Sequence, residues 1–109
     1  MIIDIKDIPV VPAHSSMIIG NEMVFDEPII LGGNHHALIG NQGPAASIKI
    51  VCEIVTTKNG EYKEAGEIIV PVSQTTLTTM DLPLTAVYKL RFVAHNDTDE
   101  TATVIIFLS

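Results

Sequence analysis

Apolar residues that alternate with polar ones, in segments cut by glycine, proline and asparagine, restrict this chain to an all-β fold. The clearest such segment is residues 46–57, ASIKIVCEIVTT. Successive side chains of a strand point to opposite faces, so one face of this segment is apolar. That face consists of Ile48, Ile50, Cys52 and Ile54. No segment of the 109 residues shows the sustained period of a helix.

A hairpin is predicted directly after this strand. Lys58-Asn59-Gly60 follows it, and Asn-Gly supplies the positive φ angles that a tight hairpin requires. Residues 61–72 should therefore return antiparallel beside the first strand, with a bulge at Gly66.

The end of the chain indicates a second hairpin, in which residues 84–95 and 100–109 flank a turn at residues 96–99. The apolar face expected for its first strand consists of Leu84, Ala86, Tyr88, Leu90, Phe92 and Ala94. The last strand is apolar on both faces near its end, so that end is either a central strand or is covered by another subunit.

The first 45 residues are less regular, with short strands predicted at residues 17–19, 23–31 and 37–39. In total, about eight strands fit an antiparallel β-sandwich of the jelly-roll or immunoglobulin-like type. Residues 1–12 contain two prolines and form either an N-terminal extended arm or an edge strand. Residues 13–109 form the sandwich domain.

The charge balance excludes several classes of partner. The chain has 13 acidic and 6 basic residues, a net charge of −7, and its basic residues never cluster. Neither nucleic acid nor an anionic membrane is therefore an expected partner. The longest apolar run near a terminus is Val104 to Leu108, far short of the roughly 20 residues of a membrane helix. The start of the chain lacks the basic and apolar regions of a signal peptide, which indicates synthesis in the cytoplasm.

His35 and His36 are candidate metal ligands, but adjacent side chains on a strand point to opposite faces. A bent loop would be needed to bring them together with His14 or His95, so we predict no metal and interpret the pair as a polar loop or strand edge. Asp97 and Asp99 lie in NDTDE, which lacks the glycine and glutamate of a helix-flanked calcium loop. A turn whose side chains bond their own backbone is the favoured interpretation, with a surface calcium site as the alternative.

Catalytic motifs are absent from the sequence, which has no nucleophile elbow, no phosphate-binding glycine loop and no Cys-x-x-Cys pair. The single cysteine, Cys52, is expected to be a buried core thiol. The pair Asp26-Glu27 is expected to be a solvated edge. We therefore predict that the protein is not an enzyme and has no cofactor. Sugar-binding sandwiches stack sugars on exposed aromatic rings, and with no tryptophan present Tyr62 is the predicted platform.

A family resemblance covers most of the chain. Its elements are IKIVCEIVTTKNGEY, the threonine-rich TTLTTMDLPL, the terminal YKLRFVAHNDTDETATVIIFLS and the opening PAHSSMIIGNEMVF. In alternation and turn placement they resemble the small β-sandwich proteins that decorate or cement tailed-phage capsids. Such proteins often carry tryptophan shortly after the Asn-Gly or Asp-Gly turn, where this chain has Tyr62.

The resemblance implies a non-enzymatic structural protein, a bacteriophage capsid decoration protein that binds the outer surface of the capsid and stabilises it. Its partner would be the major capsid protein, with a homotrimer as one arrangement at threefold junctions. Its place would be the virion exterior, after synthesis in the host cytoplasm. The alternatives are a binding module of a phage tail, fibre or adhesin that recognises carbohydrate or protein, and a cupin-like metal enzyme.

The N-terminal arm is the first candidate for the capsid contact, because it is rich in aliphatic residues and its prolines keep it extended. The candidate contact residues are Ile2, Ile3, Ile5, Ile8, Val10 and Val11. The competing interpretation is that Ile3, Ile5 and Ile8 complete an edge strand of the sandwich.

Overall fold

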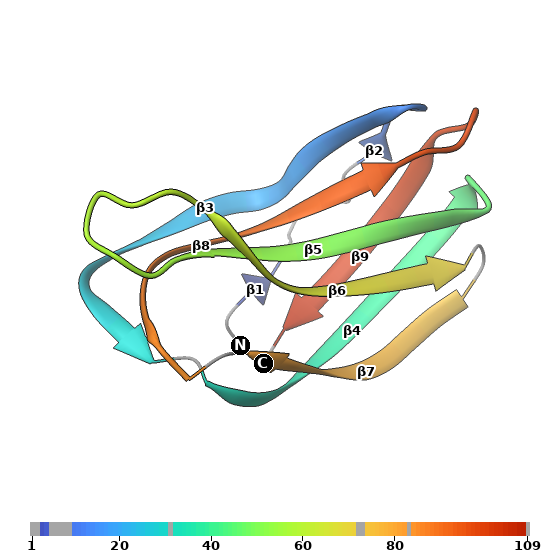
Figure 1. Cartoon of the computed structure of the whole chain (residues 1–109). Helices are drawn as coiled ribbons and strands as arrows, with labels where there is room; N and C mark the ends of the chain where they lie inside the picture. Colours follow the sequence, from blue (N-terminus) through green and yellow to red (C-terminus); the bar gives the residue numbers. More distant parts are fainter. Residues whose placement is uncertain (1–2, 5–9, 31, 72–73, 83, 109) are drawn as a thin grey trace.

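Two antiparallel sheets packed face to face make up the protein in a computed structural model, which describes residues 3–4, 10–30, 32–71, 74–82 and 84–108 (Figure 1). The predicted all-β sandwich is confirmed. The strands are β1 (Ile3–Asp4), β2 (Val10–Val11), β3 (Ser15–Ile30), β4 (Gly33–Pro44), β5 (Ser47–Val55), β6 (Lys63–Pro71), β7 (Gln74–Leu82), β8 (Ala86–Asn96) and β9 (Ala102–Leu108). No helix among the described residues is long and apolar enough to cross a membrane.

The strand order identifies the sandwich as a jelly roll. One sheet has the order β1-β9-β4-β7, with β2 also on β9, and the other has the order β3-β8-β5-β6. Four antiparallel pairs are nested in the chain, namely β2 with β9, β3 with β8, β4 with β7 and β5 with β6. A chain that first folds back on itself as one long hairpin and then rolls up gives this pattern.

The terminal hairpin predicted from residues 84–95 and 100–109 is wrong. Strand β8 pairs with β3 and β5, whereas β9 pairs with β4, β1 and β2 in the opposite sheet. The turn between them therefore crosses from one sheet to the other. Alternation determines which side chains of a strand face the core, but it does not identify the neighbouring strand.

The predicted β5–β6 pairing is confirmed, and its bulge lies one residue before the predicted position, Gly66. Cys52 pairs with Gly66 and Glu53 pairs with Glu64, which leaves Ala65 as the extra residue. The prediction of a tight turn at Asn59-Gly60 is wrong, because β5 ends at Val55, β6 begins at Lys63 and a seven-residue loop joins them. Asn59 does take a positive φ of 62° within that loop.

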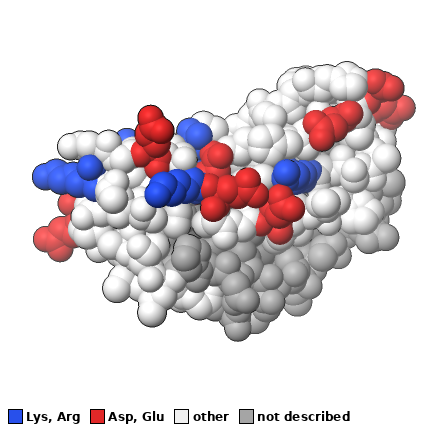
Figure 2. Space-filling model, in the orientation of Figure 1, with Lys and Arg blue, Asp and Glu red and all other residues white. Residues whose placement is uncertain are grey.

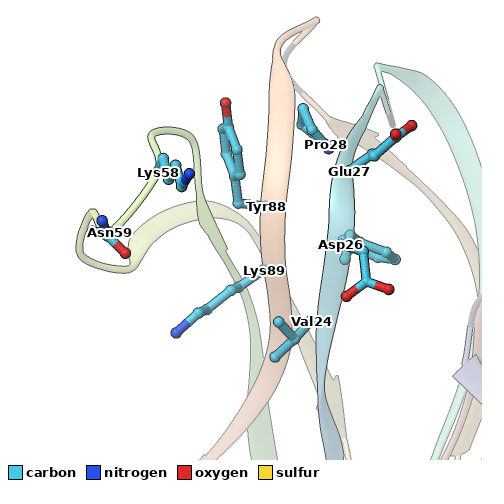
Figure 3. Close-up of a pocket in the computed structure, with 9 residues that line it drawn as sticks. Val24, Asp26, Glu27, Pro28, Lys58, Asn59, Tyr88 and Lys89 are labelled. Carbon is cyan, nitrogen blue, oxygen red and sulfur yellow. The ribbon is translucent and has the colours of Figure 1, made fainter.

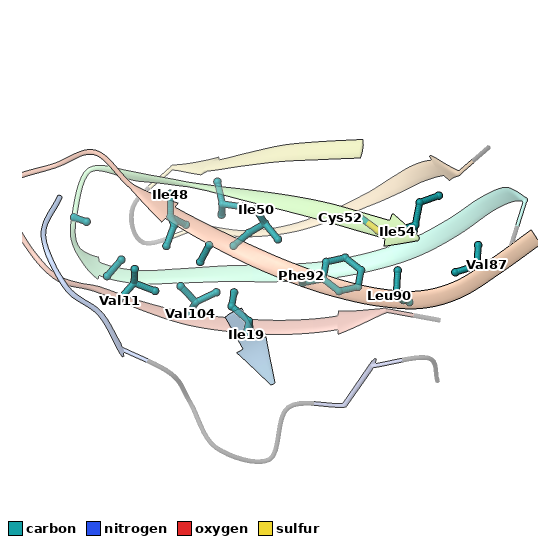
Figure 4. Close-up of a cluster of buried hydrophobic side chains, with 14 residues drawn as sticks. Val11, Ile19, Ile48, Ile50, Cys52, Ile54, Val87, Leu90, Phe92 and Val104 are labelled. Carbon is teal, nitrogen blue, oxygen red and sulfur yellow. The ribbon is translucent and has the colours of Figure 1, made fainter. Parts of the chain in front are cut away.

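The hydrophobic core lies between the two sheets and is centred on β5 and β8 (Figure 4). The predicted face of β5 is confirmed, since Ile48, Ile50, Cys52 and Ile54 are at most 3% exposed. The predicted face of β8 is correct only from Leu90 onward. Leu84 is 83% exposed and Tyr88 is half-buried, whereas Val87, which the alternation places on the opposite face, belongs to the core.

The first 45 residues form longer strands than the sequence predicts. The segment at 17–19 and residues 23–30 of the segment at 23–31 belong to one 16-residue strand, β3, that is interrupted by two irregularities in its pairing with β8, and residue 31 lies outside the described residues. The segment at 37–39 is the middle of β4. The described pieces of the arm, β1 and β2, each pair with β9, so they extend that sheet as edge strands.

Candidate functional site

A groove of about 370 Å³ lies where β3 departs from regular pairing with β8 (Figure 3). Val24 pairs with Lys89 and Ile29 pairs with Val87, so the four residues from Phe25 to Pro28 stand opposite the single residue Tyr88. Such bulges bend a strand and redirect its side chains. The lining residues are Val24, Phe25, Asp26, Glu27, Pro28, Lys58, Asn59, Tyr88 and Lys89.

The charges of this groove are divided between its two sides. The β5–β6 loop brings Lys58 and Asn59 to one side, and β8 adds Lys89 there, whereas β3 brings Asp26 and Glu27 to the other (Figure 3). The ring of Tyr88 stands between the two sides. No ion pair or side-chain hydrogen bond within the described residues uses these four charged groups. They are therefore available to hydrogen-bond a polar ligand.

Tyr62, the predicted sugar platform, is occupied by other contacts. The guanidinium carbon of Arg91 lies 3.8 Å from the centre of its ring, and its hydroxyl donates a hydrogen bond to Glu22. Burial, followed by the Glu22 hydrogen bond, raises the pKa of the Tyr62 hydroxyl above its usual value near 10. A ring face covered by a guanidinium cannot also stack on a sugar. The aromatic ring that lines the groove is the half-buried Tyr88, which the sequence placed in the core.

The outer face of the four-stranded sheet carries adjoining acidic and basic side chains (Figure 2). Arg91 donates to Glu53 at 2.7 Å, and the Lys49 amine lies 3.2 Å from Glu67. The hydrogen bond and charge of Glu67 raise the pKa of Lys49. Long charged side chains on a sheet cover apolar residues with their stems, so these pairs are consistent with a solvated sheet face.

The same face holds one serine–histidine pair, in which the hydroxyl of Ser16 lies 2.6 Å from Nδ1 of His95. Nucleophilic catalysis by such a pair needs a third group that orients the base. No carboxylate within the described residues hydrogen-bonds His95. The predicted absence of enzymatic activity stays a prediction.

The four histidines do not lie together. His35 and His36 are in β4, paired with Met80 and Thr79 of β7, so they belong to a strand rather than a bent loop. His36 and Pro44 are eight positions apart, which is about 26 Å along a strand. His14 hydrogen-bonds Asp99 in the turn at the Pro44 end, 2.5 Å away. Within the described part of the chain, no three metal-binding side chains form a group.

The acidic turn after β8 is organised by Asn96, which confirms the prediction for the asparagine of the NDTDE segment, whereas Asp99 bonds His14 rather than the backbone of the turn. The side-chain oxygen of Asn96 accepts hydrogen bonds from the backbone N–H and the hydroxyl of Thr98, at 3.0 and 2.7 Å. Asn96 is only 1% exposed, and its amide nitrogen bonds the arm as well as the turn. Asn96 therefore holds the end of the N-terminal arm, at Val11 and Pro12, against the turn after β8.

Cys52 is fully buried, as predicted, and has no disulfide partner. Burial, with a smaller contribution from the charge of Glu53, raises the pKa of its thiol to about 12. A thiol with that pKa is protonated at neutral pH and is a poor nucleophile.

The arm residues predicted to contact a capsid divide into four groups. Val10 is 52% exposed and is available to a partner, but Val11 is fully buried in the core and is not. The backbone of Ile3 pairs with Leu108 in β9. The remaining three, Ile2, Ile5 and Ile8, lie outside the described residues.

Comparison with known proteins supports the fold. No protein-family model matches the chain, and no curated protein matches it. Among solved structures, the chain is similar to the crystal structure of PirA, with a TM-score of 0.69 and 16% sequence identity. The match covers 98% of this chain and 95% of the PirA chain. At this identity the likeness shows a shared β-sandwich, so function has to be inferred from the groove and the surface.

Proposed function

We propose that the protein is a non-enzymatic binding module that holds a carbohydrate in the groove between β3 and the β5–β6 loop. The observation that carries this proposal is the position of Tyr88, half-buried between a side with two amines and a side with two carboxylates. The apolar face of a sugar stacks on an aromatic ring. Its hydroxyls both donate to carboxylates and accept from amines, which this groove supplies on opposite sides.

The size of the groove suits a small ligand. Its volume of about 370 Å³ is near the lower limit of roughly 300–1,000 Å³ for small-molecule sites. Val24, a lining residue that is 60% exposed, adds an apolar contact beside the polar groups. Apolar surface with a few convergent polar groups is the usual composition of a ligand pocket.

Substitution of Tyr88 by alanine tests the carbohydrate proposal. In titrations of isotope-labelled protein with galactose, glucose and glucuronate, we expect amide shifts around the groove for at least one sugar. Tyr88→Ala should weaken that sugar's binding by about tenfold or more, because a stacked ring contributes roughly 1–3 kcal/mol. Tyr88→Phe is the matched control, since it keeps the ring and should keep most of the affinity. Shifts elsewhere on the surface, or equal binding by Tyr88→Ala, would contradict the proposal.

Capsid decoration is a second proposed role, supported by the exposed Val10 on β2 at the edge of the five-stranded sheet. The net charge of −7 suits the outside of a capsid, where packaged DNA does not repel the protein. Weak apolar contacts of this kind gain strength when many equivalent sites act together.

Cosedimentation with emptied and mature tailed-phage capsids tests this second role. We expect saturable binding by the wild-type protein and about tenfold weaker binding by Val10→Asp, since a charge at the contact opposes burial. Val10→Asp is a sharper variant than deletion of residues 1–12, because the deletion also removes the core residue Val11. Absence of saturable binding would exclude decoration of those capsids.

A further inference from the structure

The β5–β6 loop forms the side of the groove that carries Lys58 and Asn59, and it lies outside both sheets' pairing. Ladder pairing stops at Ile54–Lys63, and the loop's own bond joins the Gly60 N–H to the Thr57 carbonyl at 3.0 Å. Bonds within a loop shape it but do not fix its distance from a neighbouring strand. What holds this loop near β3 therefore determines the width of the groove.

The described contact that ties this loop to β3 is made by Tyr62. Its hydroxyl donates to the carboxylate of Glu22, and its ring lies against Arg91 of β8, 3.8 Å from the guanidinium carbon. Arg91 is itself fixed by its 2.7 Å bond to Glu53 of β5. Tyr62 thus links the loop to three neighbouring strands of one sheet.

Glu22 is brought to this point by a second irregularity of β3. Ile19 pairs with Phe92 and Met23 pairs with Leu90, so residues 20–22 stand opposite the single residue Arg91. Gly20 takes a φ of 70° there, which side chains other than glycine adopt rarely. The irregularity at residues 20–22 of β3 therefore binds the loop, and the irregularity at residues 25–28 forms the opposite side of the groove.

We propose that Tyr62 is a positioning residue that sets the lysine-bearing side of the groove against β3 without touching the ligand. The expected effect of Tyr62 on ligand affinity rests on the proposed function. Its effect on the position of the loop does not. When the Tyr62–Glu22 bond is lost, Lys58 and Asn59 are no longer held opposite Asp26 and Glu27. A ligand that spans both sides then has to order the loop itself, which lowers its affinity.

Hydrogen exchange of the loop amides tests this inference directly. We expect Tyr62→Phe to speed exchange of the Gly60 amide, whose N–H bonds the Thr57 carbonyl within the loop, by about tenfold, while the midpoint of global unfolding changes little. Glu22→Gln keeps an acceptor oxygen but removes the charge, so its effect should be smaller. The double variant should exchange no faster than Tyr62→Phe, because Tyr62→Phe already removes the bond that Glu22→Gln only weakens. Glu61→Gln, an exposed neighbour in the loop, is the control and should behave as wild type.

Titration of the same variants with galactose and glucuronate supplies the second measurement. Tyr62→Phe should weaken binding of the sugar that occupies the groove by about threefold to tenfold, although the substituted residue is not among those lining it. Unchanged loop exchange in Tyr62→Phe would overturn the inference, and so would faster exchange with unchanged affinity. If galactose, glucose and glucuronate all fail to bind the wild-type protein, the carbohydrate proposal fails, while loop exchange still decides whether Tyr62 positions this side of the groove.

Discussion

Replacing Phe92 with alanine is expected to lower the free energy of unfolding by about 3–5 kcal/mol. Phe92 is the largest fully buried side chain of the core and comes from β8, a central strand. It pairs with Ile19 of β3 on one side and Cys52 of β5 on the other, and both partners are also fully buried. The truncation leaves a cavity that neighbours held in two sheet ladders cannot fill by moving inward.

Urea unfolding at neutral pH measures this loss. A domain of this size has a stability of about 5–15 kcal/mol, so Phe92→Ala should remove about a fifth of the total or more. Leu84→Ala is the matched control, because Leu84 is 83% exposed and its truncation should change stability by less than about 0.5 kcal/mol. A loss below about 1.5 kcal/mol for Phe92→Ala would show that the core is not centred as described.

The fold class was predictable because the residues of β5 carry a clear local signal. Ile48, Ile50, Cys52 and Ile54 occupy alternate positions of the strand, which follows from a strand with one face in the core, and all four are buried. Which strands pair with each other was harder to predict from the sequence. Residues near in sequence often pair, which suggested a β8–β9 hairpin, but in a jelly roll the partners of β8 and β9 lie far away in the chain.

The groove could not be predicted, because it forms where the pairing of β3 with β8 is irregular and the side chains no longer alternate regularly between the two faces. Regular alternation places Tyr88 with Leu90 and Phe92, but the four residues opposite Tyr88 on β3 shift it out of the core. One local signal was available, since Pro28 follows two acidic residues in the middle of an apolar segment and proline cannot donate to a ladder. The sequence does not show that Pro28 and Lys58 line the same groove, because only the fold brings them to it.

Asn96 joins the end of the N-terminal arm to the turn after β8, and as a buried polar residue it is a sensitive position of the core. Its amide nitrogen donates to the carbonyls of Val11 and Pro12, at 3.2 Å each, and to the carbonyl of Glu100 at 2.7 Å. Asn96→Asp is expected to lower the free energy of unfolding at pH 7 by about 4 kcal/mol, because a buried carboxylate would face three carbonyl oxygens. Asn96→Ala, which removes the bonds without adding a charge, should cost about 1–3 kcal/mol.

The pH dependence of Asn96→Asp separates the effect of charge from the effect of lost bonds. Burial beside carbonyl oxygens raises the pKa of the introduced carboxyl in the folded state above its unfolded value of about 3.9. At pH values above the unfolded pKa of about 3.9, the folded state binds more protons than the unfolded state. The stability of the variant relative to wild type therefore falls as pH rises. Urea unfolding between pH 3 and pH 8 should show the smallest deficit at the acid end. A deficit that is independent of pH would mean that the carboxyl escapes to solvent and that Asn96 does not hold the arm against the turn.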